Sequence, residues 1–300
     1  MLKSRLIVGG PLALLILLAV FWPGEAGAAI FAGIAGAGIY AAFTEFSSIS
    51  EGIGIDGPHR ALRYFGVALL LAIIYSPLAA RGPTGMQFPV VIWPAELLIL
   101  AMIVLYCFGS VFHAKNYTVG LNQAAMAMAG LVFVYGSLNF IVKIYFSNGL
   151  SSEGRYLLLF VAGSTKAADI GAYTAGMLTS RSQRGNHKIA PRISPKKSWE
   201  GLFGGIAMSI ATAFILYALF GNQFIFCGRQ VLNVWSAMAF GGLFGILGYF
   251  GDISESALKR AAHFDDSGSI PGLGGVLDMA DSLLFVLPVF YAFLAAKAIF

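Results

Sequence analysis

The chain has 300 residues, of which 58% are hydrophobic and 11% are charged, and its mean hydropathy is +0.80. Soluble domains carry about 25% charged residues, so this composition excludes an ordinary soluble enzyme and predicts an integral membrane protein. The formal net charge of +5 is unevenly spread, because six of the nineteen Lys and Arg residues lie between Arg181 and Lys197. Such a basic segment indicates a cytoplasmic loop and a candidate anion site.

Apolar segments long enough to span a membrane recur along the whole chain. A spanning helix needs about 20 mostly apolar residues. The pattern predicts an all-α membrane protein with about nine transmembrane helices, at residues 6–22, 26–44, 62–80, 89–112, 122–146, 156–178, 201–221, 231–250 and 282–300. The first segment also has features of a signal peptide, because basic residues precede it and Ala26-Gly27-Ala28 follows it. Its length and the closely following second span favour an uncleaved anchor.

The basic residues between the spans predict their orientation. With a cytoplasmic N-terminus, the basic positions on the cytoplasmic side are Arg60, Lys115, residues 181–197, Lys259 and Arg260. The opposite side then receives only Arg81, Arg155 and Arg229. This arrangement predicts a multi-pass protein with its functional site on the cytoplasmic side, in the inner membrane if the cell is bacterial.

The two halves of the chain differ in their polar content. Residues 1–150 are interpreted as an N-terminal transmembrane scaffold, in which small residues such as Gly33 and Gly38 favour close helix packing and leave a homodimer open. The segment from Glu45 to Arg63 is the exception, and we predict a partly ordered cytoplasmic loop there. Residues 151–300 form the predicted catalytic region of the same continuous membrane domain.

Two ionisable residues interrupt the predicted span at 156–178. Lys166 and Asp169 are three residues apart, so they share one face of a helix and can form an ion pair. Charged groups at membrane depth are costly and usually functional. This favours the wall of a polar cavity over a purely structural ion pair. Tyr173 follows one turn later, either at the same cavity or at the membrane interface.

The basic loop ends in Ser194-Pro195-Lys196-Lys197-Ser198, shortly before the next predicted span. A hydroxyl cap at a helix N-terminus with adjacent lysines can form an anion cradle. Ser198, Lys196 and Lys197 are therefore candidate phosphate contacts. The alternative is a general basic patch for anionic lipid.

Acidic residues gather around the last predicted loop. Asp252 follows the eighth span, and Asp278 and Asp281 share one helical face just before the ninth. Three carboxylates at one membrane edge repel one another unless a cation neutralises them. An all-oxygen ligand set favours Mg²⁺, with a second cation left open. The alternative is a set of solvated acids at helix N-termini.

Bases and glycines lie between these acids. Lys259 and Arg260 suit a phosphate clamp, although they could also be plain anchors at the inner leaflet. Gly274 and Gly275 belong to a glycine-rich segment whose backbone N–H groups can approach an anionic ligand. Acids, bases and glycines together favour phosphate chemistry with a divalent metal.

In this order the motifs resemble those of the phosphatidate cytidylyltransferases, also called CDP-diacylglycerol synthases. That family has the signature S-x-x-K-R-x4-K-D-x-G followed by P-G-H-G-G-x-x-D-R-x-D. The matching residues are Ser256, Lys259, Arg260, Asp266, Gly268, Pro271, Gly272, Gly274, Gly275, Asp278 and Asp281. Two further family motifs resemble the segments that begin at Asp169 and Ser194. The chain departs from the signature at Asp265, Leu273 and Met279, where the family has lysine, histidine and arginine.

The resemblance implies a reaction of CTP with phosphatidate that gives CDP-diacylglycerol and pyrophosphate, with no nucleic-acid partner. It implies metal-assisted in-line transfer, in which Asp252, Asp278 and Asp281 bind Mg²⁺ and act with Lys259 and Arg260. The implied substrate-binding residues are Lys166, Asp169, Tyr173, Ser194, Lys197, Ser198, Ser256, Gly274 and Gly275. Three alternatives stay open: a transferase for another lipid phosphate, a non-catalytic homologue, and a transporter.

Overall fold

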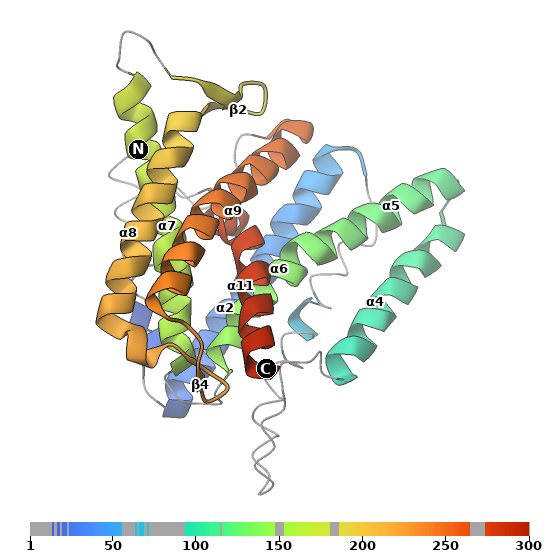
Figure 1. Ribbon diagram of the computed structural model, residues 1–300. Helices are drawn as coiled ribbons and strands as arrows, with labels where there is room; N and C mark the ends of the chain where they lie inside the picture. Colours follow the sequence, from blue (N-terminus) through green and yellow to red (C-terminus); the bar gives the residue numbers. More distant parts are fainter. Residues whose placement is uncertain are drawn as a thin grey trace, which may run out of the picture.

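Helices make up most of the chain in the computed structural model (Figure 1). The structure describes residues 24–55, 94–114, 116–147, 153–180, 186–264 and 274–299, with isolated positions before residue 23 and between 64 and 71. The helices are α2 (Gly24–Gly52), α4 (Pro94–Phe112), α5 (Tyr117–Gly130), π-helical η1 (Leu131–Tyr135), α6 (Gly136–Tyr145), α7 (Glu153–Ser180), α8 (Trp199–Phe220), 3₁₀-helical η2 (Gly221–Gln223), α9 (Val234–Ala261), α10 (Val276–Ala280) and α11 (Leu283–Ile299).

Two short antiparallel hairpins connect the helices. Strand β1 (Lys188–Ala190) pairs with β2 (Ser194–Ser198), and β3 (Ile225–Phe226) pairs with β4 (Arg229–Gln230). The first hairpin lies near the C-terminal ends of α7 and α9, whereas the second lies at the opposite end of the bundle (Figure 1). Neither hairpin forms a closed sheet.

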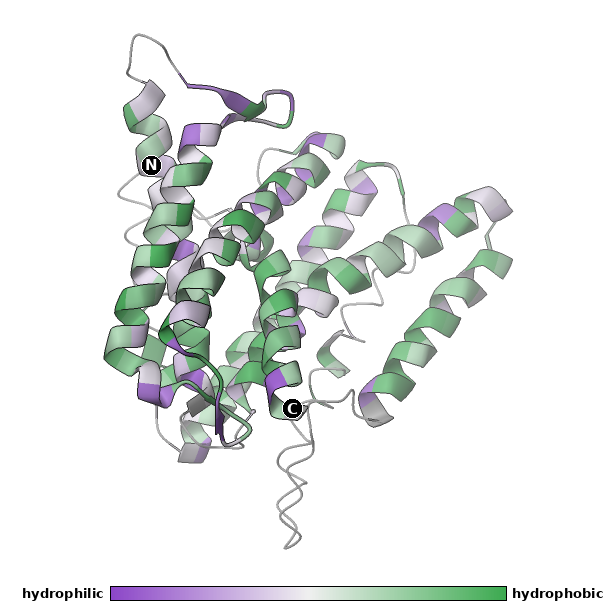
Figure 2. Cartoon of the chain, viewed as in Figure 1, coloured by the Kyte–Doolittle hydropathy of each residue, from purple (hydrophilic) through white to green (hydrophobic). Residues whose placement is uncertain are grey.

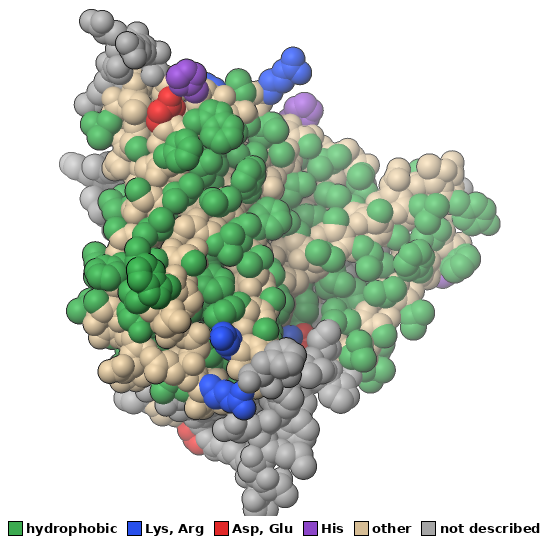
Figure 3. Space-filling model, viewed as in Figure 1, with side chains coloured by type: hydrophobic (Ala, Val, Ile, Leu, Met, Phe, Trp, Pro, Cys, Tyr) green, Lys and Arg blue, Asp and Glu red, His purple; other side chains and the backbone are tan. Residues whose placement is uncertain are grey.

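Four helical segments among the described residues are long and apolar enough to cross a membrane. They are Gly24–Gly52, Tyr117–Tyr145, Trp199–Gln223 and Val234–Ala261, and Glu96–Phe112 and Leu283–Ala298 are shorter apolar helices. Apolar side chains cover the outer faces of these helices, while polar residues concentrate near their ends (Figures 2 and 3). The predicted helical membrane protein is thus confirmed, whereas nine spans and a cytoplasmic N-terminus stay predictions. Most of the predicted spans at 6–22 and 62–80 lies outside the described residues.

Small residues allow α7, α8 and α9 to approach closely. A Cβ atom added to Gly204 on α8 would lie 2.2 Å from the Cβ of Ala175 on α7. One added to Gly241 on α9 would lie 2.7 Å from the Cβ of Ala213 on α8. Close helix packing through small residues therefore occurs in the second half of the chain. Among the described residues, a Cβ added to Gly33 would meet nothing within 4 Å, so close packing at that residue stays a prediction.

A buried aromatic cluster fixes α11 against α7 and α9. The Phe160 ring lies 5.7 Å from the Phe244 ring and 5.8 Å from the Phe290 ring, measured between centroids. All three side chains are fully buried. Such aromatic pairs add to the hydrophobic stabilisation of a core. The cluster thereby sets the position of the turn before α11, which carries Asp281.

Helix α2 extends further than the sequence pattern indicates. The segment from Glu45 was predicted to be a loop, but α2 continues to Gly52, so Glu45 and Glu51 are helical. The loop prediction is wrong for these positions, because the apolar face of α2 stays buried through Phe46 and Ile49. Residues 56–63 lie outside the described part of the chain.

Candidate active site

The ion pair predicted within α7 is present and contacts the turn before α11. The Lys166 Nζ atom lies 3.1 Å from Asp169 Oδ2 and 2.8 Å from Ser282 Oγ. The Ser282 hydroxyl in turn lies 3.0 Å from Asp169 Oδ2, and Lys166 Nζ is 3.8 Å from Asp281 Oδ1. Lys166 and Asp169 are partly exposed, at 42% and 37%. The pair therefore connects α7 to the turn before α11, which carries Asp281. Both of its side chains remain partly accessible to solvent.

Lys197 connects the first hairpin to α9. Its Nζ atom lies 2.5 Å from Asp252 Oδ2, and it also donates to the backbone carbonyl of Tyr249 at 3.3 Å. The same ammonium group lies 4.4 Å from the centroid of the Tyr249 ring. The Ser256 hydroxyl donates to Asp252 Oδ1 at 3.5 Å. Asp252 is thus held between a lysine and a hydroxyl, with 36% of its side chain exposed.

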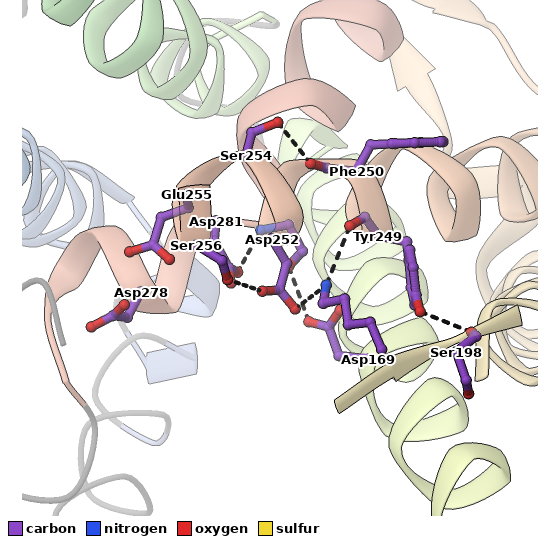
Figure 4. Close-up of polar contacts among 12 residues, drawn as sticks. Asp169, Ser198, Tyr249, Phe250, Asp252, Ser254, Glu255, Ser256, Asp278 and Asp281 are labelled. Carbon is purple, nitrogen blue, oxygen red and sulfur yellow. Dashed lines mark hydrogen bonds and ion pairs between the residues drawn. The ribbon is translucent and has the colours of Figure 1, made fainter. Parts of the chain in front are cut away.

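Asp281 lies between α10 and α11, beside Asp252 and Asp169 (Figure 4). Its side chain is 14% exposed, and its Oδ1 atom accepts the Ser282 backbone N–H at 2.5 Å. Burial and the Asp252 carboxylate raise the pKa of Asp281 to about 6, although the Lys166 charge opposes the shift. This carboxylate therefore lies where negative charge is costly without a cation. We refer to Lys166, Asp169, Lys197, Asp252, Asp281 and Ser282 as the inner cluster.

A second group of charged residues surrounds α10. Lys259 on α9 forms ion pairs with Glu255 Oε2 at 2.7 Å and with Asp278 Oδ1. Asp278 Oδ2 accepts the Gly275 backbone N–H at 2.8 Å. Glu45 on α2 accepts the backbone N–H groups of Val276 and Leu277, each at 2.8 Å. We refer to Glu45, Glu255, Lys259, Gly275 and Asp278 as the loop cluster.

The acids predicted to share one cation therefore lie in two groups. Asp252 and Asp281 belong to the inner cluster, whereas Asp278 lies beside Glu255 (Figure 4). Within the part of the chain that the structure describes, no three His, Cys, Asp or Glu side chains are grouped so as to hold a metal ion.

Three other predicted site residues, Ser198, Tyr173 and Ser194, differ in their burial and in their contacts. The Ser198 hydroxyl caps α8 by accepting the Gly201 N–H at 3.1 Å, as expected from the sequence, and its carbonyl accepts the Tyr249 hydroxyl at 2.8 Å. The Ser198 side chain is buried, at 1% exposure, and its hydroxyl is occupied by the cap. Tyr173 is 69% exposed, which fits the interfacial alternative. Ser194 pairs with Ala190 at the far end of β2.

The remaining predicted site residues are two glycines before α10 and one arginine near the end of α9. Gly274 has a φ of 81°, and an added Cβ atom would lie 2.3 Å from Asp278 Oδ2, so a side chain there would strain the backbone and displace the Asp278 carboxylate. Gly275 contributes its N–H to Asp278, and Arg260 is exposed near the end of α9. The signature positions from Asp265 to Leu273 lie outside the described residues.

Three residues of the two clusters were not predicted as site residues. Glu255 precedes Lys259 by four positions, which is the spacing of a helical ion pair, and this could have been read from the sequence. Ser282 directly follows Asp281 but carries no distinctive signal. Glu45 lies 231 residues before Val276, so only the folded structure shows their contact.

The chain is similar to known proteins over most of its length. Residues 3–297 match the model of the cytidylyltransferase family. A phosphatidate cytidylyltransferase of Chlamydia trachomatis is 29% identical over 246 residues, which cover 81% of this chain and 76% of that protein. One from Thermotoga maritima is 33% identical over 242 residues, covering 80% of this chain and 81% of that protein. An uncharacterized protein of Escherichia coli K12 is 37% identical over 142 residues, covering 47% and 43%.

The match spans both clusters and nearly the whole chain. It covers α2, which contributes Glu45, as well as α7, the first hairpin, α9 and α10. The chain therefore belongs to the cytidylyltransferase family.

Proposed function

We propose that this protein is a phosphatidate cytidylyltransferase, which converts CTP and phosphatidate to CDP-diacylglycerol and pyrophosphate. The observation that carries the proposal is the inner cluster, in which Lys166, Lys197, Asp252 and Asp281 meet from four separate segments, namely α7, β2, α9 and the turn before α11. The family match and the relatives named phosphatidate cytidylyltransferase support it. These findings favour an enzyme over the transporter alternative.

The charges of the inner cluster suit a divalent cation. The cluster contains three carboxylates, Asp169, Asp252 and Asp281, but only two ammonium groups, Lys166 and Lys197. Mg²⁺ is usually bound by one or two protein carboxylates together with substrate phosphates. Asp252 and Asp281 would hold it, and the raised pKa of Asp281 fits a carboxylate that lies beside other acids without a cation. When bound, Mg²⁺ would neutralise charge on the triphosphate.

The proposed reaction needs no covalent intermediate on the protein. A phosphate oxygen of phosphatidate forms a bond to the α-phosphorus of CTP, while the bond from that phosphorus to the bridging oxygen breaks. Pyrophosphate leaves opposite and takes the electron pair. The nucleophile and the leaving group are both anions, so positioning and charge neutralisation lower the barrier most.

Different residues of the two clusters would supply positive charge and hold the reacting groups in position. Lys166 and Lys197 supply positive charge at the inner cluster, and exposed Arg260 adds charge near the end of α9. Asp169 and Ser282 fix the Lys166 ammonium group through contacts of 3.1 and 2.8 Å. Lys259 and Asp278 act from the loop cluster, where their ion pair holds α10 in place.

The proposed location is the cytoplasmic face of the bacterial inner membrane. The hairpin of β1 and β2 carries exposed Lys188, Arg192 and Lys196, which is the pattern expected for a cytoplasmic end. Lipid tails would remain in the inner leaflet while the phosphate enters the inner cluster. A homodimer through the N-terminal spans stays a prediction.

The lipid acceptor can be tested with a panel of lipid phosphates. Purified protein is incubated with Mg²⁺, CTP and either phosphatidate, lysophosphatidate or an isoprenoid phosphate, and pyrophosphate release is measured. We expect phosphatidate to be the preferred acceptor. Preference for an isoprenoid phosphate would favour the alternative transferase, and no release with any lipid would contradict the proposed activity.

The close contact between α9 and Asp281 gives a further prediction. A Cβ atom added to Gly251 would lie 2.4 Å from the backbone carbonyl oxygen of Asp281. Gly251→Ala should therefore displace the turn before α11, cost about 1–3 kcal/mol of stability and lower turnover at least about ten-fold. Gly242→Ala on the same helix is the control, since its Cβ would meet only the flexible Ile210 side chain at 3.6 Å. Equal turnover in both variants would contradict the importance of this contact.

The raised pKa of Asp281 predicts a pH dependence of metal binding. Below a pH of about 6 the carboxyl group is increasingly protonated and neutral, so a cation must displace a proton to bind. Affinity for Mn²⁺, measured by electron paramagnetic resonance without substrates, should fall as the pH decreases through 6. Asp281→Asn should bind weakly and without this transition. A wild-type affinity that is constant from pH 5 to pH 7 would contradict the Asp281 assignment.

A further inference from the structure

Helix α10 is too short to be stable by itself. It has five residues, Val276–Ala280, and isolated helices shorter than about 12–15 residues are marginal in water. The first N–H groups of a helix also lack partners within the helix. Contacts from elsewhere in the chain must therefore hold α10, which carries Asp278, in position.

Carboxylates satisfy three consecutive N–H groups at the start of α10. The Gly275 N–H donates to Asp278 Oδ2, and the next two N–H groups donate to Glu45, one to each carboxylate oxygen at 2.8 Å. A carboxylate that accepts two backbone N–H groups makes charge-assisted hydrogen bonds, which are stronger and more directional than neutral ones. Glu45 therefore fixes the backbone position and direction of α10 from a different part of the chain.

The position of α10 determines where the loop cluster lies. Asp278 pairs with Lys259, and Lys259 pairs with the buried Glu255. Asp281 follows α10 directly and is the most buried acid of the inner cluster. A shift of α10 would therefore move Asp278 and Asp281 together, and would change both clusters at once.

We propose that Glu45 is a positioning residue for the reaction. It clamps the start of α10 so that Asp278 and Asp281 keep their places relative to α9. This inference rests on the proposed function, because its kinetic part requires cytidylyl transfer. It assigns a role to Glu45, which belongs to a segment that the sequence alone predicts to be a partly ordered loop.

Two measurements on Glu45→Ala, Glu45→Gln and Glu45→Asp test the proposal. Hydrogen–deuterium exchange of a peptide that contains Val276 and Leu277 reports the clamp directly. Steady-state kinetics with CTP and phosphatidate report its effect on transfer. Glu51→Gln is the matched control, since it makes the same chemical change on an exposed position of the same helix.

We expect Glu45→Ala to speed exchange at Val276 and Leu277, and to lower kcat, each at least about ten-fold. The KM for CTP should change less than kcat, and the melting temperature should stay close to that of the wild type. Glu45→Gln should be intermediate, because its amide offers one acceptor oxygen in place of two. Glu45→Asp should restore part of the loss, and Glu51→Gln should match the wild type.

The results separate the clamp from the reaction. Unchanged exchange in Glu45→Ala would overturn the clamp, whatever the activity. Faster exchange with a wild-type kcat would overturn the positioning role. A wild-type protein that transfers no cytidylyl group would instead overturn the proposed function, and the exchange data would still decide whether Glu45 holds α10.

Discussion

Asp281→Asn is expected to lower cytidylyl transfer at least about 100-fold while leaving the protein folded. Asn has the shape of Asp but lacks the charge that we assign to Mg²⁺ binding. Asp281 is also the most buried acid of the inner cluster, and Asp252 and Asp169 lie beside it. Removing its charge should relieve repulsion, so the melting temperature should stay equal or rise. Loss of activity without loss of stability is typical of a residue kept for function.

The control for Asp281→Asn is Glu25→Gln, which makes the same change in the first turn of α2. Its turnover should equal that of the wild type. Turnover would be measured in detergent with phosphatidate and a series of Mg²⁺ concentrations. If Asp281→Asn keeps near-normal magnesium-dependent turnover, the assignment of Asp281 to the metal site is wrong.

Lys259→Met is expected to abolish transfer and also to destabilise the fold. Its Nζ atom lies between Glu255, which is 1% exposed, and Asp278, which is 13% exposed. Removing one partner of a buried ion pair typically costs about 3–5 kcal/mol, because the remaining charges stay buried without compensation. Thermal unfolding in detergent and the transfer assay would measure the two effects separately.

The double variant Lys259→Met/Glu255→Gln distinguishes structural from functional loss. It removes one of the two uncompensated carboxylates, so most of the lost stability should return. Transfer should remain at least about 100-fold below that of the wild type, because Asp278 has still lost its partner. Recovery of both stability and transfer would show that Lys259 only compensates buried charge.

Asp278→Asn should also abolish turnover. The resemblance implies that Asp278 binds the metal, which stays a prediction, and in the structure its carboxylate contacts Lys259 and the Gly275 N–H. The substitution should therefore also weaken the contacts that hold α10 in place.

Local relationships such as the Lys166–Asp169 pair and the Ser198 cap were predictable from the sequence. Each depends on two residues that are three positions apart, within a helix or at its start.

The division of the acids into two clusters was not predictable from spacing. Asp252 and Asp281 meet because Gly251 lets the α9 backbone approach the turn that follows α10. The contact between Glu45 and α10 joins positions 231 residues apart, and no local pattern indicates it. The loop prediction after Glu45 failed because polar residues interrupt an apolar pattern that nevertheless remains helical.

The most direct test follows the phosphorus atoms of CTP. Purified protein would be incubated with phosphatidate, Mg²⁺ and CTP labelled either at the α-phosphate or at the γ-phosphate. Attack at the α-phosphorus predicts that the α-label enters the lipid and the γ-label leaves in pyrophosphate. Transfer of the γ-label to the lipid, or no labelled lipid from either nucleotide, would contradict cytidylyl transfer by this protein.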